Sequence, residues 1–209
     1  MWGLLSPDLI VSMGGLDIPE PAEGSPVRLL RVQGTFPHGA IGGVEVDYLA
    51  ERGHTRIGYA AAASPRLELI AAERLRGALD RAAELGLPPL DIAAIEIEDA
   101  DAVLAAVDRW TSGRDAVTAI CAHNDEIATL LIAALNARGL VPGRDLAIIG
   151  VDNIPLARIG ITTVEINIEA YTEVVVDRVM RALDGADIDE LCGPITGPDL
   201  MRLIVRDSA

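Results

Sequence analysis

Basic residues are scarce in this chain, and there is no lysine among its 209 residues. Aspartate and glutamate together number 32 against 17 arginines, which gives a formal net charge of −15. A surface with this excess of negative charge repels phosphate backbones. We therefore expect that this chain alone does not bind nucleic acid.

Cysteine, histidine and aromatic residues are also few. Cys121 and Cys192 do not predict a disulfide scaffold, and the three histidines are scattered without the spacing of metal ligands. The first residues lack a basic segment followed by an apolar one, and no apolar run is long enough to cross a membrane. We expect no metal, no cofactor, no membrane contact and a cytoplasmic location.

Aliphatic residues dominate what is present, since 50% of the chain is hydrophobic and only 3% is aromatic. This usage is typical of parallel sheets buried on both faces. Between residues 55 and 165 the hydrophobic pattern alternates between strand-like and helix-like segments. The alternation predicts a doubly wound α/β fold with right-handed crossovers. Strands are expected over residues 4–5, 27–32, 56–61, 92–97, 117–121, 146–151 and 200–205, and helices over 41–52, 64–86, 103–110, 127–139 and 167–185.

Several residues mark the ends of these helices. Ser64 followed by proline predicts a helix start, and Asn167 can cap the helix after it. Gly53 is placed to end the helix over residues 41–52.

Asn124 and Asp152 each follow an apolar strand. Small ligands bind in open parallel sheets at the carboxyl ends of the strands. The two residues therefore predict one ligand-binding edge of the sheet.

The same region resembles the lactose-repressor/galactose-repressor (LacI/GalR) family. Residues 121–128 resemble the family's "ANDxxA" segment, and residues 139–152 its "GLxVPxDxxVxGxD" segment. Further segments resemble the family in the same order along residues 39–209. They are residues 49–58 ("LxxxGHxxIa"), 74–77 ("RxxG"), 161–164 ("LTTV") and 203–208, the closing strand.

This resemblance implies the effector-binding domain of a transcriptional regulator with a periplasmic-binding-protein-like fold. Two doubly wound parallel-sheet subdomains would flank a cleft, with chain crossings near His54, Thr163 and Gly185. The N-terminal subdomain would comprise residues 1–54 and 165–185, and the C-terminal subdomain residues 55–164 and 186–209.

By matching motif positions, the resemblance implies that Arg74, Asn124 and Asp152 bind the ligand. Asp152 can accept hydrogen bonds from two hydroxyl groups, and Arg74 can donate through its planar guanidinium. Asn124 offers both a donor and an acceptor. The implied ligand is a small polar metabolite, similar to a sugar or a nucleoside.

Each of these residues also has a purely structural interpretation. Asn124 can simply cap the following helix, with Asp125 as a second cap or a surface acid. Asp152 can be a loop acid at the end of a strand. Arg74 can be a solvated helix residue, or pair with one of its acidic neighbours on the helix, which are Glu73 and Asp80.

Catalysis is not expected. Cys121 and His123 suggest a thiol nucleophile with its base, but no third group is evident that would orient the base. His54 is interpreted as a structural residue at a crossing. We therefore expect neither catalytic residues nor a metal site.

Two departures from the family pattern are visible. By the resemblance, the chain would begin after the segments that form a helix-turn-helix, a hinge helix and the first β-α units. We therefore expect an N-terminally truncated subdomain whose exposed apolar surface drives association, as a homodimer or with a partner chain that completes it. Residues 36–40 also stand where an aspartate is usual, and Ile166 stands where a polar residue is expected.

Four functions are compatible with these observations. The first is an effector-binding domain that changes the DNA affinity of an intact regulator. The second is a solute-binding protein of the transport class, and the third an enzyme on an α/β scaffold. The fourth is a dimerising remnant that binds no ligand. The order of the motifs favours the first.

Overall fold

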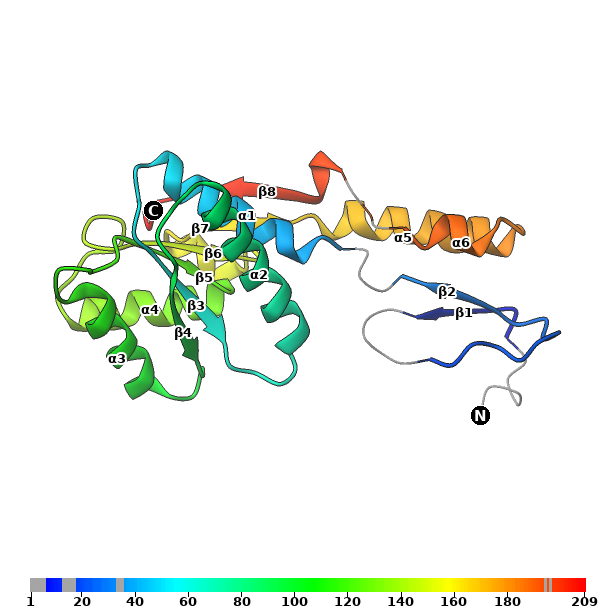
Figure 1. Ribbon diagram of the computed structural model, residues 1–209, viewed down its shortest axis with the longest axis horizontal. Coiled ribbons are helices and arrows are strands. Elements are labelled where there is room, and N and C mark those ends of the chain that lie inside the picture. Colours follow the sequence, from blue (N-terminus) through cyan, green and yellow to red (C-terminus); the bar gives the residue numbers. More distant parts are fainter. Residues whose placement is uncertain (1–6, 13–17, 33–35, 194, 196) are drawn as a thin grey trace. The chain divides into compact units, whose positions relative to one another are not determined.

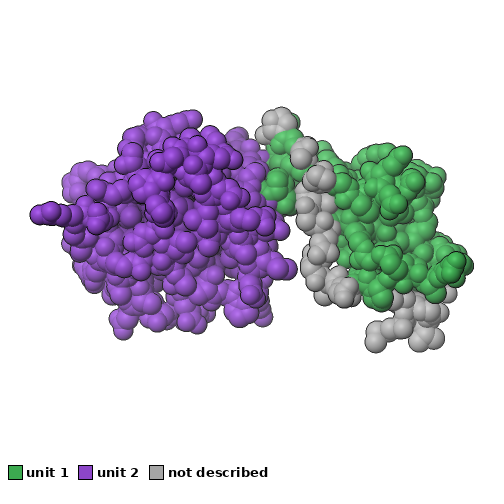
Figure 2. Space-filling model, viewed as in Figure 1, with its two compact units in different colours: residues 1–37, 167–200 green, residues 38–166, 201–209 purple. Residues whose placement is uncertain are grey.

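A computed structural model describes residues 7–12, 18–32, 36–193, 195 and 197–209. The chain divides into two compact units, residues 1–37 with 167–200 and residues 38–166 with 201–209 (Figure 2). The boundaries between these two units differ from the subdomain boundaries expected from the sequence. Residues 38–51 lie in the second unit because they form a helix packed on another helix of that unit. Residues 188–191 lie in the first because they contact its strand β2 (Arg28–Arg31).

The second unit contains a six-stranded sheet with the strand order β4-β3-β5-β6-β7-β8 (Figure 1). Its strands are parallel except β8, which is antiparallel to β7. This confirms the predicted α/β class with a parallel-dominated sheet. The strands are β3 (Ile57–Ala62), β4 (Asp91–Ile95), β5 (Ala119–Ala122), β6 (Ala147–Val151), β7 (Thr162–Ile166) and β8 (Met201–Ile204).

Helices cover both faces of this sheet. The helices are α1 (His38–Glu51), α2 (Glu68–Glu84), α3 (Ala100–Thr111) and α4 (Asp125–Ala137), with the 3-10 helix η2 (Pro155–Ile159) after β6. The helices α3 and α4 contribute to one hydrophobic cluster with β5 and β6, and neither α1 nor α2 contributes to it. The helices α1 and α2 contact β3, β5, β6 and β7 instead, on the other face.

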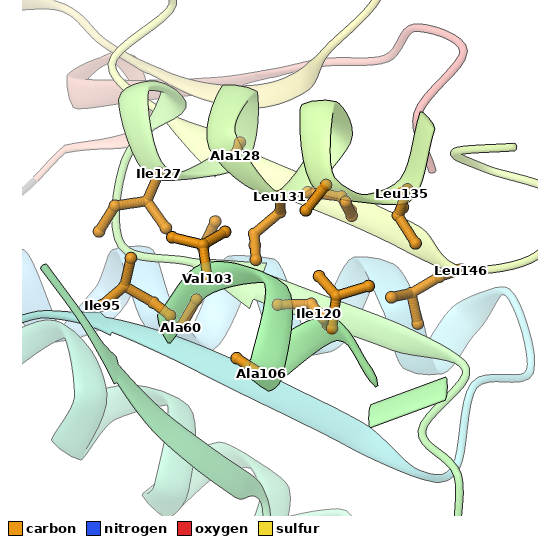
Figure 3. Packing of buried hydrophobic residues seen from close by; sticks show 14 of the residues in the cluster. Ala60, Ile95, Val103, Ala106, Ile120, Ile127, Ala128, Leu131, Leu135 and Leu146 are labelled. Carbon is orange, nitrogen blue, oxygen red and sulfur yellow. The ribbon is translucent and has the colours of Figure 1, made fainter. Parts of the chain in front are cut away.

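The cluster under α3 and α4 is built from aliphatic side chains. Leu131 and Leu135 of α4 lie over Ile120 of β5 and Leu146 (Figure 3). All are essentially inaccessible to solvent. Burying a leucine or isoleucine side chain contributes roughly 1.5–3 kcal/mol. This core fixes α4, whose first turn lies at the carboxyl edge of the sheet.

The helices α1 and α2 cross at very short range because glycines lie at the crossing. A Cβ atom on Gly77 would lie 1.8 Å from the carbonyl oxygen of Gly39, and one on Gly42 would lie 2.1 Å from that of Arg74. Any larger residue at either glycine would separate the two helices. The glycine of the RxxG segment therefore sets the position of the arginine one turn before it.

The helix ends match the sequence expectations in part. The backbone N–H of Gly53, at φ +88°, donates to the Ala50 oxygen and ends α1, as expected. The expected start at Ser64 is wrong, since α2 begins at Glu68. Residue Ser64 instead forms a turn in which its carbonyl oxygen accepts from the N–H of Leu67 at 3.0 Å.

The first unit contains the parallel strands β1 (Leu9–Ser12) and β2 (Arg28–Arg31). It also contains the helices α5 (Ile168–Leu183), α6 (Ile188–Leu191) and η3 (Pro198–Leu200). Strand β2 confirms the strand expected over residues 27–32, and the expected cap is confirmed because Asn167 accepts from the N–H of Ala170. The strand predicted at residues 4–5 lies outside the described residues. Among those described, no helix is long and apolar enough to span a membrane.

Candidate ligand-binding site

Asp152 lies directly after β6, at the carboxyl edge of the six-stranded sheet. Its backbone is in the left-handed region with φ 98°, and the next residue, Asn153, has φ 49°. The N–H of Asp152 still donates to the Val164 oxygen of β7 at 2.9 Å, so the strand pairing continues into the turn. The Asp152 side chain is 35% exposed and therefore accessible to a ligand.

Arg74 reaches the same edge from α2. Its Nη2 donates to Oδ1 of Asp152 at 3.1 Å, and its Nη1 donates to the carbonyl oxygen of His123 at 2.6 Å. The Arg74 side chain is only 5% exposed. Arg74 is therefore not a solvated helix residue, and its ion pair is with Asp152 instead of Glu73 or Asp80, so that it links the ends of β5 and β6.

Asn124 begins α4 at this edge. Its Oδ1 accepts from the N–H of Ile127 at 2.9 Å, which confirms the expected cap. Because the cap uses only the carbonyl oxygen, the amide nitrogen of the side chain remains as a hydrogen-bond donor. The structure thus brings Arg74, Asn124 and Asp152 to one edge of one sheet.

Asp125 is not the second cap or surface acid expected from the sequence. Its side chain is buried, and its Oδ2 accepts from the backbone N–H of Ile154 at 3.0 Å. Burial raises the pKa of this carboxyl to about 6, although hydrogen bonds from Thr163 and the Ile154 N–H oppose the rise. The residue was misjudged because the turn that covers it lies far away in sequence.

Cys121 and His123 do not form an activated thiol. Burial raises the pKa of the Cys121 thiol well above its usual value. Burial, together with the nearby Arg74 guanidinium, lowers the pKa of His123 to about 4. A neutral thiol beside a neutral imidazole lacks the thiolate that nucleophilic chemistry needs. His54 contacts Thr118, with 2.9 Å between Nδ1 and Oγ1, in line with a structural residue.

The chain matches the model of the periplasmic binding protein-like domain over residues 46–209. It belongs to that family. No curated protein sequence is similar enough to this chain to count as a relative.

Solved structures agree with this membership in the periplasmic binding protein-like family. A LacI-family regulatory protein from Chloroflexus aggregans is 24% identical with a TM-score of 0.75, over 96% of this chain and 76% of that one. A sugar-binding LacI-family regulator from Escherichia coli, complexed with phosphate, is 21% identical with a TM-score of 0.72, over 100% and 79%. The regulator GntR from Chromobacterium violaceum is 20% identical with a TM-score of 0.71, over 99% and 80%. At these identities the likeness shows the fold alone, which this chain shares with these regulators.

One buried acid of this periplasmic binding protein-like domain was missed by the sequence reasoning. Glu45 of α1 is fully buried, and neither carboxyl oxygen has a hydrogen-bond partner among the described residues. Burial raises its pKa well above the usual value, Arg74 lowers it, and Asp125 and Asp152 raise it further. The sequence does indicate its burial, because Glu45 lies between Ile41 and Leu49 at helical spacing, on the apolar stripe of α1.

The described part of this domain contains no group of three or more His, Cys, Asp or Glu residues that could hold a metal ion. The edge of the sheet instead offers a half-exposed carboxylate backed by a buried guanidinium, with an amide donor on the neighbouring helix. That set is suited to reversible hydrogen bonding of a polar molecule.

Proposed function

We propose that this domain senses a small polar metabolite, similar to a sugar or a nucleoside, as the effector-binding domain of a LacI/GalR-type transcriptional regulator. The observation that carries the proposal is the pair formed by Arg74 and Asp152 beside Asn124 at the carboxyl edge of the sheet. Asp152 would accept from ligand hydroxyl groups, and the Asn124 amide would donate to a ligand oxygen. No catalytic step is proposed.

Arg74 has a supporting role in this proposal. Its two hydrogen bonds go to His123 and to Asp152 Oδ1, so it directs the carboxylate and neutralises its charge. The Oδ2 atom of Asp152 then faces the ligand. Binding would act as an equilibrium shift between two conformations of an intact regulator, and so change its affinity for DNA.

The test is a ligand screen on the purified chain by thermal shift, followed by titration calorimetry. The panel contains D-glucose, D-galactose, D-ribose, D-fructose, adenosine and guanosine. Hydrogen bonds to charged groups contribute about 1.5–3 kcal/mol, so Asp152→Asn is expected to weaken binding roughly 10- to 100-fold. The matched control is Asp108→Asn, which removes an exposed ion pair with Arg138 on the opposite layer of helices and leaves Kd unchanged.

The proposal fails if no member of such a panel binds, or if Asp152→Asn and Asp108→Asn have the same affinity as the wild type. The alternative of a solute-binding protein of the transport class has the same site and predicts the same binding result. It differs in the coupled output, because only a regulator changes DNA affinity with the ligand. The homodimer and the cytoplasmic location both stay predictions. Light scattering tests the oligomeric state.

A further inference from the structure

Two consecutive left-handed residues form the turn that carries Asp152. Glycine favours φ values near that of Asp152, 98°, whereas a residue with a Cβ atom is strained there. Asparagine tolerates the φ of 49° at residue 153 better than most residues. Strain of this kind persists only where the surrounding structure holds the turn in place.

Hydrogen bonds from three separate segments hold this turn. The Asn153 N–H donates to Thr163 Oγ1 of β7 at 3.3 Å, and the Ile154 N–H donates to Asp125 Oδ2 of α4 at 3.0 Å. The Asn153 side chain is held at both ends, since Nδ2 donates to Glu165 Oε1 at 2.7 Å and Oδ1 accepts from Arg206 Nη2 at 2.8 Å.

The residues that hold Asn153 are themselves fixed. Arg206 Nη1 donates to the carbonyl oxygen of Ile161 at 2.6 Å, and its backbone N–H donates to Thr162 Oγ1 at 2.9 Å. Glu165 Oε2 accepts from Arg202 at 2.6 Å. The turn is therefore held against β7, the segment that follows β8 and the first turn of α4.

None of these contacts goes to the Asp152 carboxylate. Within the described residues, this carboxylate accepts its hydrogen bond from Arg74. The contacts fix the backbone on which the carboxylate stands and leave the carboxylate itself open on one side. An aspartate at the most strained position of the turn has its carboxylate within hydrogen-bonding distance of Arg74 and leaves that carboxylate partly exposed.

We infer that Asp125, Asn153, Glu165 and Arg206 are positioning residues, a clamp that holds Asp152 in its left-handed conformation so that its carboxylate meets both Arg74 and the ligand. The role of the clamp in ligand binding rests on the proposed function, whereas the clamp itself does not. The strain and its release can be measured without any ligand.

The ligand-free test compares Asp152→Gly with Asp152→Ala by thermal unfolding. Both variants lose the carboxylate, but only glycine relieves the strain. Asp152→Gly is expected to melt roughly 2–10 °C above Asp152→Ala. The control pair is Ser112→Gly and Ser112→Ala, at an exposed loop residue with φ −108°, where alanine is expected to be the more stable.

Clamp contacts are then removed by a second substitution in Asp152→Gly and in Asp152→Ala. Arg206→Met keeps the aliphatic stem and loses the donor to Asn153, so the turn can relax and the difference between glycine and alanine at residue 152 is expected to fall by at least half. Asp125→Asn retains an oxygen acceptor for the Ile154 N–H, and should preserve the difference. Asp125→Ala should reduce it as Arg206→Met does. An unchanged difference in both clamp variants, or no advantage of glycine in the intact clamp, overturns the inference.

A second readout uses whichever of the six compounds above binds. Arg206→Met is expected to weaken its binding about tenfold in the wild-type background and less than twofold in the Asp152→Asn background, because the clamp acts through Asp152. Equal losses in the two backgrounds would contradict the inference. If no compound binds, the proposed function fails while the melting comparison still decides whether the clamp exists.

Discussion

Glu45 offers a sharp test of the electrostatics beneath the candidate ligand-binding edge. Its carboxyl is fully buried, and its pKa lies well above the usual value because burial penalises the charged form. Nearby acids strengthen this effect, and Arg74 opposes it. Replacing Glu45 with glutamine keeps the size and shape of the side chain and removes the titration.

The sign follows from proton binding in the two states. In the unfolded chain the glutamate loses its proton near pH 4.3, whereas the folded chain retains it to a higher pH. Above that point, folding requires uptake of a proton. The free energy of unfolding of the wild type therefore falls, by up to about 1.4 kcal/mol per pH unit, until the folded pKa is passed. Glu45→Gln lacks this loss.

Thermal unfolding between pH 4 and pH 7.5 measures the difference. A domain of this size shifts its Tm by about 2–4 °C per kcal/mol, so the advantage of Glu45→Gln should grow by up to about 3–6 °C per pH unit above pH 4.5. Asp125, with its pKa raised to about 6, adds a loss of the same sign to both proteins. Glu51→Gln, at the exposed end of the same helix, should follow the wild type. Parallel curves for Glu45→Gln and the wild type would refute the reasoning.

Three further predictions concern the structure around the site. Gly77→Ala is expected to lower the Tm by several degrees and to weaken ligand binding, since its Cβ would lie 1.8 Å from the Gly39 oxygen. Gly43→Ala is the control in the same melting assay and should be neutral or stabilising, because the atom nearest to its Cβ would lie 3.9 Å away. Asn124→Ala should lower the unfolding free energy by about 1 kcal/mol through loss of the cap, and Asn124→Ser should restore stability but not ligand affinity in calorimetry. Leu131→Ala should cost roughly 3–5 kcal/mol in urea unfolding, because the side chain is fully buried in the core under α4.

The fold of the second unit was predictable because its local signals agree with one another. Runs such as residues 146–151 are apolar throughout, which a strand buried on both faces requires. The spacing of Ile127, Leu131 and Leu135 predicts α4, and the structure buries all three. The start of α2 was not predictable in this way. A serine followed by proline is compatible with a helix start, yet the same residues form a turn before Glu68.

The site was predictable in part, because the sequence locates its residues but does not show which of their side chains are buried. Asn124 and Asp152 could be placed because strand ends can be located from hydrophobic runs alone. Whether an acidic side chain near them is buried depends on segments distant in sequence. Asp125 is covered by the turn at Ile154, and Glu45 by the packing of α1 against the sheet and α2. Sequence periodicity places Glu45 on the apolar stripe of its helix, but it does not reveal which groups surround the carboxyl.

The motif residues divide into those proposed to contact the ligand and those that hold the proposed site in place. Arg74 resembles a ligand residue in sequence, and its Nη1 and Nη2 atoms donate to the His123 carbonyl oxygen and to Asp152 Oδ1. The missing side chain of Gly77 lets α2 approach α1 closely enough for Arg74 to reach β5 and β6. Spacing in the RxxG segment thus reflects helix packing as much as recognition. Arg74 holds the Asp152 carboxylate, and Gly77, one helical turn later, sets the position of Arg74. A substitution at Gly77 should therefore impair the proposed site even though Gly77 is not proposed to contact the ligand.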